Sequence, residues 1–413
     1  MSDRVGEDPA MPEQRPNRVS RRGFLGGTAA AVAAMAACSP RQTASTASSG
    51  PSPAGEVDWA NEPFHGVHQA GIATIPQTYG TFVAFDLRPK TGRTELQRLM
   101  RLLTDDARRL TQGVPALADS DPELAAPAAR LTITFGFGPG VFSAVDAEDQ
   151  APPALRLPSF SIDRLEKKWS GGDLLVQACA DDRLTLAHAV RVIVKDARAF
   201  ATVRWVQHGF RRPPSTQPLG TTQRNLFGQL DGTVNPRPGT PEFDRAVWVS
   251  DGPEWLRGGT TLVLRRIRMH LETWDELDRE GKEFAIGRRL SDGAPLTGGK
   301  ETDEPDFSAL TPAGFPVISE MAHIRRAHVA DPGMRILRRP YNYDEGITAD
   351  GRSDAGLLFA AYQASIERQF IPIQRRLAEA DLLNQWTTPI GSAAFAIPPG
   401  CGPDGWIGET LLG

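Results

Sequence analysis

The segment Arg224–Pro236, with the sequence RNLFGQLDGTVNP, contains the first candidate for chemistry, the carboxylate of Asp231. Gly228 and Gly232 stand on either side of it. Because glycine has no Cβ, the backbone can turn sharply there and approach a flat partner closely. Asp231 would then stand at the edge of that approach. An Asp-Gly pair followed closely by Asn-Pro is also typical of an ordinary solvent turn, so the segment alone leaves both interpretations open.

His323 is the candidate for binding a metal. The chain has seven histidines, and we read His323 as a lone imidazole without a second ligand beside it. One imidazole cannot build a tetrahedral zinc site. It can bind a haem iron, because the macrocycle supplies four other donors. The remaining histidines are expected to be structural.

Activating a peroxide on such an iron needs a proton acceptor and a fixed cation on the opposite face. Asp231 could take the proton from one peroxide oxygen and deliver it to the other, which is general acid–base catalysis. Arg338 is always protonated, so it could stabilise the charge that develops as the O–O bond breaks. A plain salt bridge between Asp231 and Arg338 is the alternative interpretation of this pair.

The elements that must position these residues follow one order twice. In the first half, amphipathic and alternating patterns predict strands and helices. The strands are expected at Gly80–Leu87, Leu131–Phe137, Asp173–Ala180 and Ala201–His208, and the helices at Arg93–Thr111 and Arg183–Ala197. This β-α-β-β-α-β order is that of a ferredoxin-like unit.

The order recurs beyond a linker rich in Pro and Thr at Arg211–Thr222. The second set comprises strands at Thr260–Met269, Met334–Tyr341, Gly356–Gln363 and Ser392–Ile397, with helical pieces at Leu271–Leu277, Glu283–Arg288 and Ile366–Leu383. We therefore predict an α+β fold of two tandem ferredoxin-like halves, residues 56–212 and 213–413, whose antiparallel sheets supply a shared interior.

Residues 1–55 have the layout of an export signal and a spacer. Paired arginines at Arg21 and Arg22 precede an Ala/Gly-rich apolar run that ends at Ala37 and is too short to span a membrane. This pattern predicts a twin-arginine signal peptide, and therefore a protein exported to the periplasm, the cell envelope or the medium by the twin-arginine machinery. Cleavage near Ala36 and lipidation of Cys38 are both open.

Composition excludes several classes of protein. The 46 basic and 50 acidic side chains give no basic footprint for nucleic acid. Three cysteines without a Cys-x-x-Cys pair exclude a zinc ribbon, although a single Cys179–Cys401 bridge is open. No Gly-x-Ser-x-Gly motif occurs, and the glycines of Gly136–Gly140 fail the dinucleotide pattern. The sequence leaves a homo-oligomer open.

The sequence resembles the dye-decolourising peroxidases, specifically their twin-arginine-exported branch. The family's Gly-x-x-Asp-Gly motif stands here at Gly228–Gly232, and similar segments run in the same order from His65–Ala73 to Ile397–Gly400. The resemblance implies haem b bound in the C-terminal half, and an enzyme that reduces hydrogen peroxide and oxidises bulky phenols or dyes. The alternative is a deferrochelatase-like protein that binds haem in order to release its iron in iron uptake.

The resemblance also implies roles for single residues. His323 would be the proximal iron ligand, Asp231 the distal acid–base residue and Arg338 the distal arginine. Arg288 matches a position that contacts a haem propionate. The other residues expected near the haem edge belong to the distal loop: Gly232, Thr233 and Asn235.

A carboxylate normally accepts the second N–H of a metal-bound imidazole, and Asp381 or Glu379 is the candidate, with Asp381 preferred. Some relatives place an asparagine just after the distal arginine segment, whereas Arg339 and Pro340 follow here, which puts a distal amide in doubt. Large substrates could be oxidised at the surface through aromatic residues, for which the candidates are Tyr341, Tyr343, Trp386 and Trp406.

Overall fold

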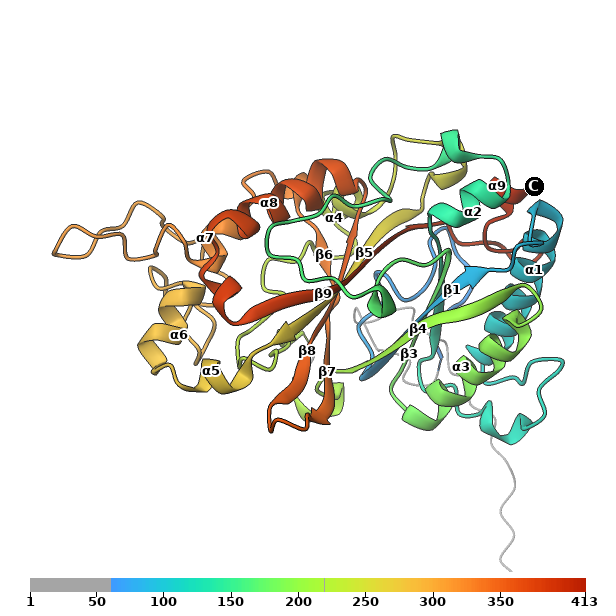
Figure 1. Ribbon diagram of the computed structural model, residues 1–413, viewed down its shortest axis with the longest axis horizontal. Coiled ribbons are helices and arrows are strands. Elements are labelled where there is room, and N and C mark those ends of the chain that lie inside the picture. Colours follow the sequence, from blue (N-terminus) through green and yellow to red (C-terminus); the bar gives the residue numbers. More distant parts are fainter. Residues whose placement is uncertain (1–60, 219) are drawn as a thin grey trace, which may run out of the picture. The chain divides into compact units, whose positions relative to one another are not determined.

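A computed structural model describes residues 61–218 and 220–413 of the chain (Figure 1). The first half contains the predicted elements in the predicted order. Its strands are β1 (Tyr79–Leu87), β2 (Thr132–Phe137), β3 (Leu174–Ala180) and β4 (Ala201–Phe210), and its longer helices are α1 (Arg93–Leu110) and α3 (Arg183–Ala197), with the short α2 at Pro139–Ala144. The β-α-β-β-α-β interpretation of this half is confirmed.

The first sheet has the strand order β2-β3-β1-β4, and its neighbouring strands are antiparallel. Val83 of β1 pairs with Val176 on one side and Val206 on the other. Helix α1 buries Leu96, Leu99 and the other apolar residues of its stripe in the core beside this sheet. Figure 1 shows α1 and α3 together against the sheet.

The second half repeats the arrangement around β5. Strand β5 lies between β8 and β9, and β7 pairs with the far side of β8. The strands are β5 (Thr260–Met269), β6 (Leu337–Arg338), β7 (Tyr341–Ile347), β8 (Ser353–Gln363) and β9 (Thr387–Ile397). The helices are α4 (Pro241–Val247), α5 (Leu271–Asp275), α6 (Arg279–Ile286), α7 (His323–Ala327), α8 (Ile371–Ala380) and α9 (Glu409–Leu412).

The two sheets join at both edges. Phe137 of β2 pairs with Ala396 of β9, and Phe210 of β4 pairs with Asn342 of β7. Because β5 also pairs with β8, the strands of the two halves close into a ring. One core cluster draws apolar residues from both halves, including Phe82 of β1 and Phe395 of β9. The α+β fold and its shared interior are therefore confirmed.

Two predicted elements of the second half were wrong in extent. Met334–Tyr341 is not one strand, because Pro340 has no N–H to give to the sheet and separates β6 from β7. Ile366–Leu383 is not one helix, since Asp381 is extended, with φ −73° and ψ 126°, and ends α8. This break turns the chain so that Asp381 can reach a neighbouring element.

The Cys179–Cys401 bridge does not form, because both thiols are free and buried. No helix among residues 61–218 and 220–413 is long and apolar enough to cross a membrane. The predictions for residues 1–55, including Arg21, Arg22 and Cys38, lie outside the described residues. The division of the chain at residue 212 stays a prediction.

Candidate active site

The loop that carries Asp231 is held in place by its own backbone and by the side chain of Arg224. Gly228 and Gly232 have φ values of +77° and +131°, a region that side chains with a Cβ rarely enter. The N–H of Asp231 donates to the carbonyl of Gln223 at 2.7 Å. Arg224 donates to the carbonyl of Gly228 at 2.7 Å and to that of Leu290 at 2.8 Å. Glycine is therefore needed at both positions for the turn that carries Asp231.

Asp231 and Arg338 meet across 107 residues of sequence. Nη1 of Arg338 lies 2.7 Å from Oδ1 of Asp231, and the two side chains are 20% and 12% exposed. Asn235 holds the backbone of Arg338 from both sides: its Nδ2 donates to the Arg338 carbonyl at 2.6 Å, and its Oδ1 accepts from the Arg338 N–H at 3.0 Å. Both partners of the ion pair line the main cavity.

His323 begins α7 and is oriented by a carboxylate. Its Nδ1 donates to Oδ2 of Asp381 at 2.6 Å, which leaves Nε2 with a free lone pair. Burial opposes protonation of the ring, but the charge and hydrogen bond of Asp381 outweigh it and raise the pKa of His323. Glu379, the other candidate, is 69% exposed and pairs with Arg326 instead. The structure thus brings Asp381 to His323.

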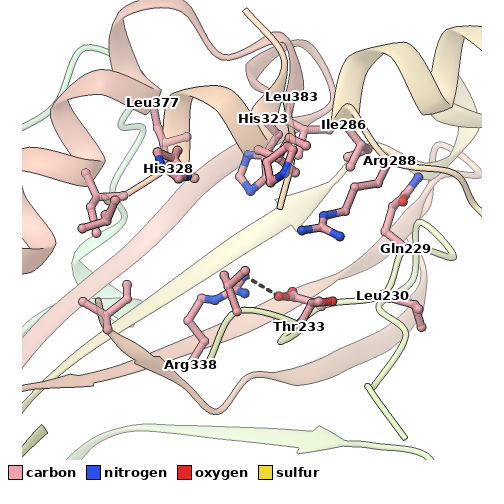
Figure 2. A pocket seen from close by; sticks show the side chains of 18 of the residues that line it. Gln229, Leu230, Thr233, Ile286, Arg288, His323, His328, Arg338, Leu377 and Leu383 are labelled. Atoms are coloured by element: carbon pink, nitrogen blue, oxygen red, sulfur yellow. Dashed lines mark hydrogen bonds and ion pairs between the residues drawn. The ribbon is translucent and has the colours of Figure 1, made fainter. Parts of the chain in front are cut away.

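The cavity separates these two groups. Figure 2 shows His323 on one side and Arg338 on the other, with the dashed line marking the ion pair of Arg338. The space between them is about 1180 Å³, part of it open to solvent. Much of its wall is apolar, as expected for a large flat ligand, and includes Ile286, Ile324, Ile336, Phe359, Ile373 and Leu377.

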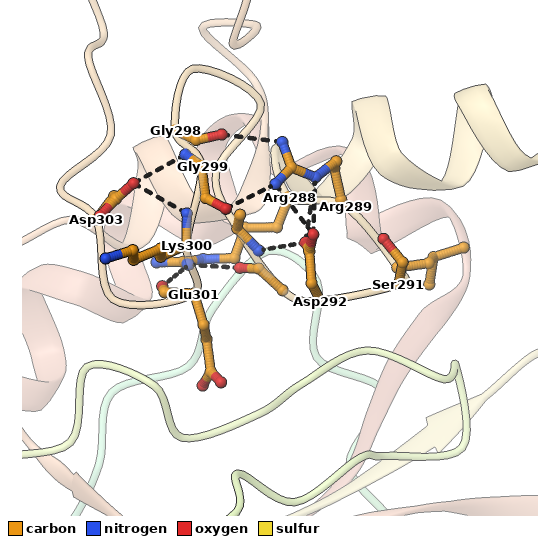
Figure 3. Close-up of polar contacts among 12 residues, drawn as sticks. Arg288, Arg289, Ser291, Asp292, Gly298, Gly299, Lys300, Glu301 and Asp303 are labelled. Carbon is orange, nitrogen blue, oxygen red and sulfur yellow. Dashed lines mark hydrogen bonds and ion pairs between the residues drawn. The ribbon is translucent and has the colours of Figure 1, made fainter.

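Arg288 supplies a buried cation at the cavity wall. It follows α6 and Gly287, whose φ is +89°. The residue is 7% exposed, and its Nη1 donates to the carbonyls of Gly293 at 2.7 Å and Glu301 at 2.8 Å (Figure 3). Burial, and then the nearby charge of Arg338, lowers the pKa of Arg288. A cation bonded to neutral carbonyls is suited to an anionic ligand group.

These residues fit haem. The Nε2 of His323 is one nitrogen donor, which suffices where a macrocycle supplies the rest. The apolar wall suits the macrocycle, and the guanidinium of Arg288 suits a carboxylate on its edge. Asp231 and Arg338 lie on the side of the cavity opposite His323, so they would face the free side of the macrocycle.

The structure places the other predicted residues in different positions. Thr233 lines the main cavity, as expected, whereas Gly232 and Asn235 are absent from its wall. Asn235 borders a neighbouring polar cavity and contacts the backbone of Arg338, and Gly232 serves the turn. Asp381 takes the position behind the imidazole of His323 that was predicted for it, and a contact of Gly232 or Asn235 with the cofactor stays a prediction.

Sequence reasoning missed several cavity residues. Asn225 and Gln229 bring amide groups to the wall from the distal loop, and His328 and Arg335 also line it. The apolar wall from α8 was not recognised either, although the spacing of Ile373 and Leu377 marks one helix face. Arg339 points elsewhere, because its guanidinium donates to Gln77 and to the carbonyl of Thr74.

The aromatic candidates are mostly out of reach of solvent. Tyr341, Tyr343 and Trp406 are 0%, 1% and 4% exposed, so none of them can receive a bulky donor directly. Trp386 is half-buried and stands edge-on to Trp274, with ring centroids 5.4 Å apart. Among the four candidates, Trp386 alone keeps a surface position.

An imidazole backed by a carboxylate and facing a carboxylate–guanidinium pair across a largely apolar cavity, within two ferredoxin-like halves, is the arrangement of a haem-binding peroxidase. Comparisons with known proteins agree. The family model described as Dyp-type peroxidase, N-terminal, matches residues 69–211, and Dyp-type peroxidase, C-terminal, matches residues 222–402. The chain therefore belongs to the Dyp-type peroxidase family.

Individual relatives support the same assignment. A Dye-decolorizing peroxidase of Thermobifida fusca is 41% identical over 345 residues, which cover 80% of each chain. A Deferrochelatase of Yersinia pestis bv. Antiqua is 34% identical over 436 residues, which cover 100% of each. The structure of a DyP-type peroxidase from Cellulomonas bogoriensis matches with a TM-score of 0.83 and 52% identity, over 86% of this chain and 98% of that one.

Dyp-type peroxidases are haem enzymes, and haem is the cofactor of this chain. The protein is an oxidoreductase that reduces hydrogen peroxide and oxidises bulky phenolic or dye-like donors.

Proposed function

We propose that His323 binds the haem iron on one side of the cavity and that Asp231 and Arg338 act on peroxide from the other. When bound, the haem supplies the iron at which peroxide is reduced. The observation that carries this assignment is the placement of the His323–Asp381 pair opposite the Asp231–Arg338 pair (Figure 2).

Asp231 is the general base and acid in this scheme. Its carboxylate takes a proton from one peroxide oxygen and returns it to the oxygen that leaves as water, which lowers the barrier by avoiding free charged oxygen. Arg338 lies 2.7 Å away and cannot take the proton itself. Its fixed positive charge stabilises the negative charge that develops on the separating oxygens.

His323, Asp381 and Arg288 hold the cofactor rather than the peroxide. The hydrogen bond to Asp381 fixes the imidazole ring and increases its basicity. Arg288 would bind a propionate, because its Nη1 is anchored to two carbonyls and its remaining donors are left for the ligand. Thr233 lines the opposite side of the cavity, with Arg338 (Figure 2).

The test is an absorption spectrum of the haem-loaded protein before and after one equivalent of hydrogen peroxide, in wild type and in Arg338→Ala. We expect a prompt spectral change in wild type and a slow one in the variant. Haem that binds to the wild-type protein but ignores peroxide would refute the assignment.

Release of iron from haem is the second candidate function, favoured by the full-length similarity to a Deferrochelatase. This activity would need His323 and the cavity but not Asp231 and Arg338 together. Incubation with haem and an iron chelator, without peroxide, separates the two functions. Iron transfer that survives in an Asp231→Asn, Arg338→Ala double variant would support the second function.

We further propose that the protein is exported by the twin-arginine route, which suits a protein that folds around its cofactor before transport. The support is the order of paired arginines, apolar run and small residues at the N-terminus. Cell fractionation of wild type and of an Arg21→Lys, Arg22→Lys variant tests this. Equal export of both would refute the proposal.

A further inference from the structure

Glu301 lines a second, polar cavity and is hydrogen-bonded to a residue on the wall of the main cavity. This polar cavity adjoins the first and is lined by Glu301 and Thr233, while Thr233 also lines the main cavity together with Asp231. Oε1 of Glu301 accepts a hydrogen bond from the Thr233 hydroxyl at 2.8 Å. A carboxylate in the outer cavity is thus hydrogen-bonded to a hydroxyl on the wall of the inner one.

The loop around Glu301 is built to hold this carboxylate in place. The Glu301 carbonyl accepts from Arg288 at 2.8 Å, and Asp303 accepts the N–H groups of Gly299 and Lys300 at 2.8 and 2.9 Å. Figure 3 shows the Glu301 side chain extending away from this network. Its Oε1 also accepts from the hydroxyl of Thr222. The hydrogen bond between Glu301 and Thr233 therefore joins the loop of Glu301 to the distal loop.

The reaction needs protons from outside the cavity. Reduction of peroxide to two waters follows H2O2 + 2 e⁻ + 2 H⁺ → 2 H2O. A donor too bulky to enter the cavity gives up its electron from outside and leaves its proton in solvent. Two protons must then enter separately, and a largely buried aspartate paired with an arginine is poorly placed to fetch them.

We propose that Glu301 takes up protons from solvent in the polar cavity and passes them through the Thr233 hydroxyl into the main cavity, toward Asp231. Oε1 of Glu301 accepts the Thr233 hydroxyl while the carboxylate is charged. Once Glu301 is protonated, the Thr233 O–H turns into the main cavity, Oγ1 receives the proton from Oε1, and the hydroxyl gives its own proton to the main cavity, so no charge remains on Thr233. The step rests on the proposed function, in which Asp231 is the residue that handles protons at the peroxide.

Other charged groups face the same polar cavity and will shape the pH dependence of proton uptake. They are Arg237, Glu242, Arg288, Asp303, Glu304 and Arg335. Arg335 lies 3.6 Å from Glu304, so that acid is partly neutralised. Among the acids that line the polar cavity, Glu301 is the one whose carboxylate accepts a hydrogen bond from a hydroxyl on the wall of the main cavity.

The test compares Glu301→Gln and Thr233→Val with a matched control, Thr222→Val. Thr222 also donates to Glu301 but is absent from the walls of both cavities. We expect the first two variants to lower steady-state dye oxidation by about 10-fold and to increase the solvent deuterium isotope effect, because proton entry becomes slower. Thr222→Val removes a hydrogen bond to Glu301 but leaves the path through Thr233 intact, so it should lose less activity than Thr233→Val and keep the wild-type isotope effect, and Thr233→Ser should restore the rate that Thr233→Val loses.

A second readout needs no turnover. Amide hydrogen exchange of residues 222–236 in the haem-free protein should be the same in wild type and Glu301→Gln, because the amide oxygen still accepts both hydroxyls. Faster exchange in that variant, or equal losses of activity in Thr222→Val and Thr233→Val, would show that Glu301 only holds the loop. Wild-type rates and isotope effects in Glu301→Gln would also overturn the proposal.

Asp231→Asn separates this inference from the proposed function. If Asp231→Asn loses dye oxidation while Glu301→Gln and Thr233→Val keep the wild-type rate, the proposed function stands and only the proton path is refuted. Active Asp231→Asn would remove the proposed function, whatever the Glu301 variants do. If Glu301→Gln does not fold, the Thr233→Val and Thr233→Ser pair still decides the matter.

Discussion

Two aspartates of the site have different partners and therefore different tasks. Asp231 faces the cavity beside a permanent cation, Arg338, at 2.7 Å. Asp381 stands behind an imidazole, with its Oδ2 on Nδ1 of His323 and its Oδ1 on the N–H of Leu383 at 3.0 Å. A carboxylate already bound on both oxygens orients its partner, whereas one at the cavity wall can exchange a proton with a ligand.

Asp231→Asn preserves size and removes the proton acceptor. We expect the variant to bind haem as wild type does and to lose turnover by about 10²–10⁴-fold, the usual contribution of a general acid–base residue. Haem content by absorbance and peroxide-dependent dye oxidation measure the two effects. Asp350→Asn, at an exposed turn, is the control and should be neutral. Loss of haem in Asp231→Asn would instead mark the ion pair as structural.

Asp381→Asn should weaken haem binding, since an amide is a poorer acceptor for the imidazole N–H. Outer partners of metal ligands typically contribute about 10–100-fold in affinity, so a loss of that size is expected in a haem titration. Glu379→Gln is the matched control, because Glu379 pairs with Arg326 at the surface. Equal effects of the two substitutions would contradict the assignment of Asp381.

At the scale of elements, the site depends on contacts between a loop and a very short strand. Strand β6 pairs with β8 only through Leu337 and Arg338. The distal loop supplies the rest of the support through Asn235, which bonds both the N–H and the carbonyl of Arg338. The position of the guanidinium is thus set jointly by the sheet and the loop.

Asn235→Ala should release this connection. Leaving backbone groups without partners costs about 1–3 kcal/mol, so we expect a lower melting temperature, faster exchange of the Arg338 amide and reduced turnover with haem still bound. Asn235→Asp keeps the acceptor for the Arg338 N–H and should be affected less. An Asn235→Ala variant with wild-type exchange at Arg338 would contradict this account.

At the scale of the whole molecule, the site lies in one half of a fold whose sheets close on each other, so its position depends on the first half as well. That half contains an acidic pair: Asp106 of α1 is 2% exposed and lies beside Asp196 of α3. Burial, and then the charge of Asp196, raises the pKa of Asp106 from 3.8 to about 7. The protonated form is therefore favoured by folding.

The contribution of Asp106 to the free energy of unfolding should fall as the pH rises. Because the pKa of Asp106 is higher in the folded than in the unfolded protein, its stabilising contribution is fully present below about pH 4 and is lost as the pH rises toward 7. A rise from 3.8 to about 7 corresponds to at most about 4 kcal/mol. Asp106→Asn should therefore gain stability relative to wild type between pH 5 and pH 8, as measured by denaturant unfolding at each pH. A difference that does not change with pH would refute the raised pKa.

Much of the fold could be predicted from the sequence, because it depends on local periodicity. The apolar stripe of α1 and the alternation of the strands are set by neighbours within a few residues, and they gave the order of both halves. Gly228 and Gly232 marked the distal turn for the same reason. The break at Pro340 was open to the same local reasoning, since proline has no N–H for a sheet, and was overlooked, whereas the break at Asp381 brings this carboxylate to His323, a contact between distant segments.

The sequence by itself determined the residue types that the chemistry needs: an acid between glycines, a lone imidazole and an arginine. Only the tertiary structure decided how they combine. It set Asp231 against Arg338 and Asp381, instead of Glu379, behind His323, and it hydrogen-bonded Glu301 of the polar cavity to Thr233 on the wall of the main cavity. Such choices depend on distances between segments far apart in the chain, which periodicity and spacing do not contain.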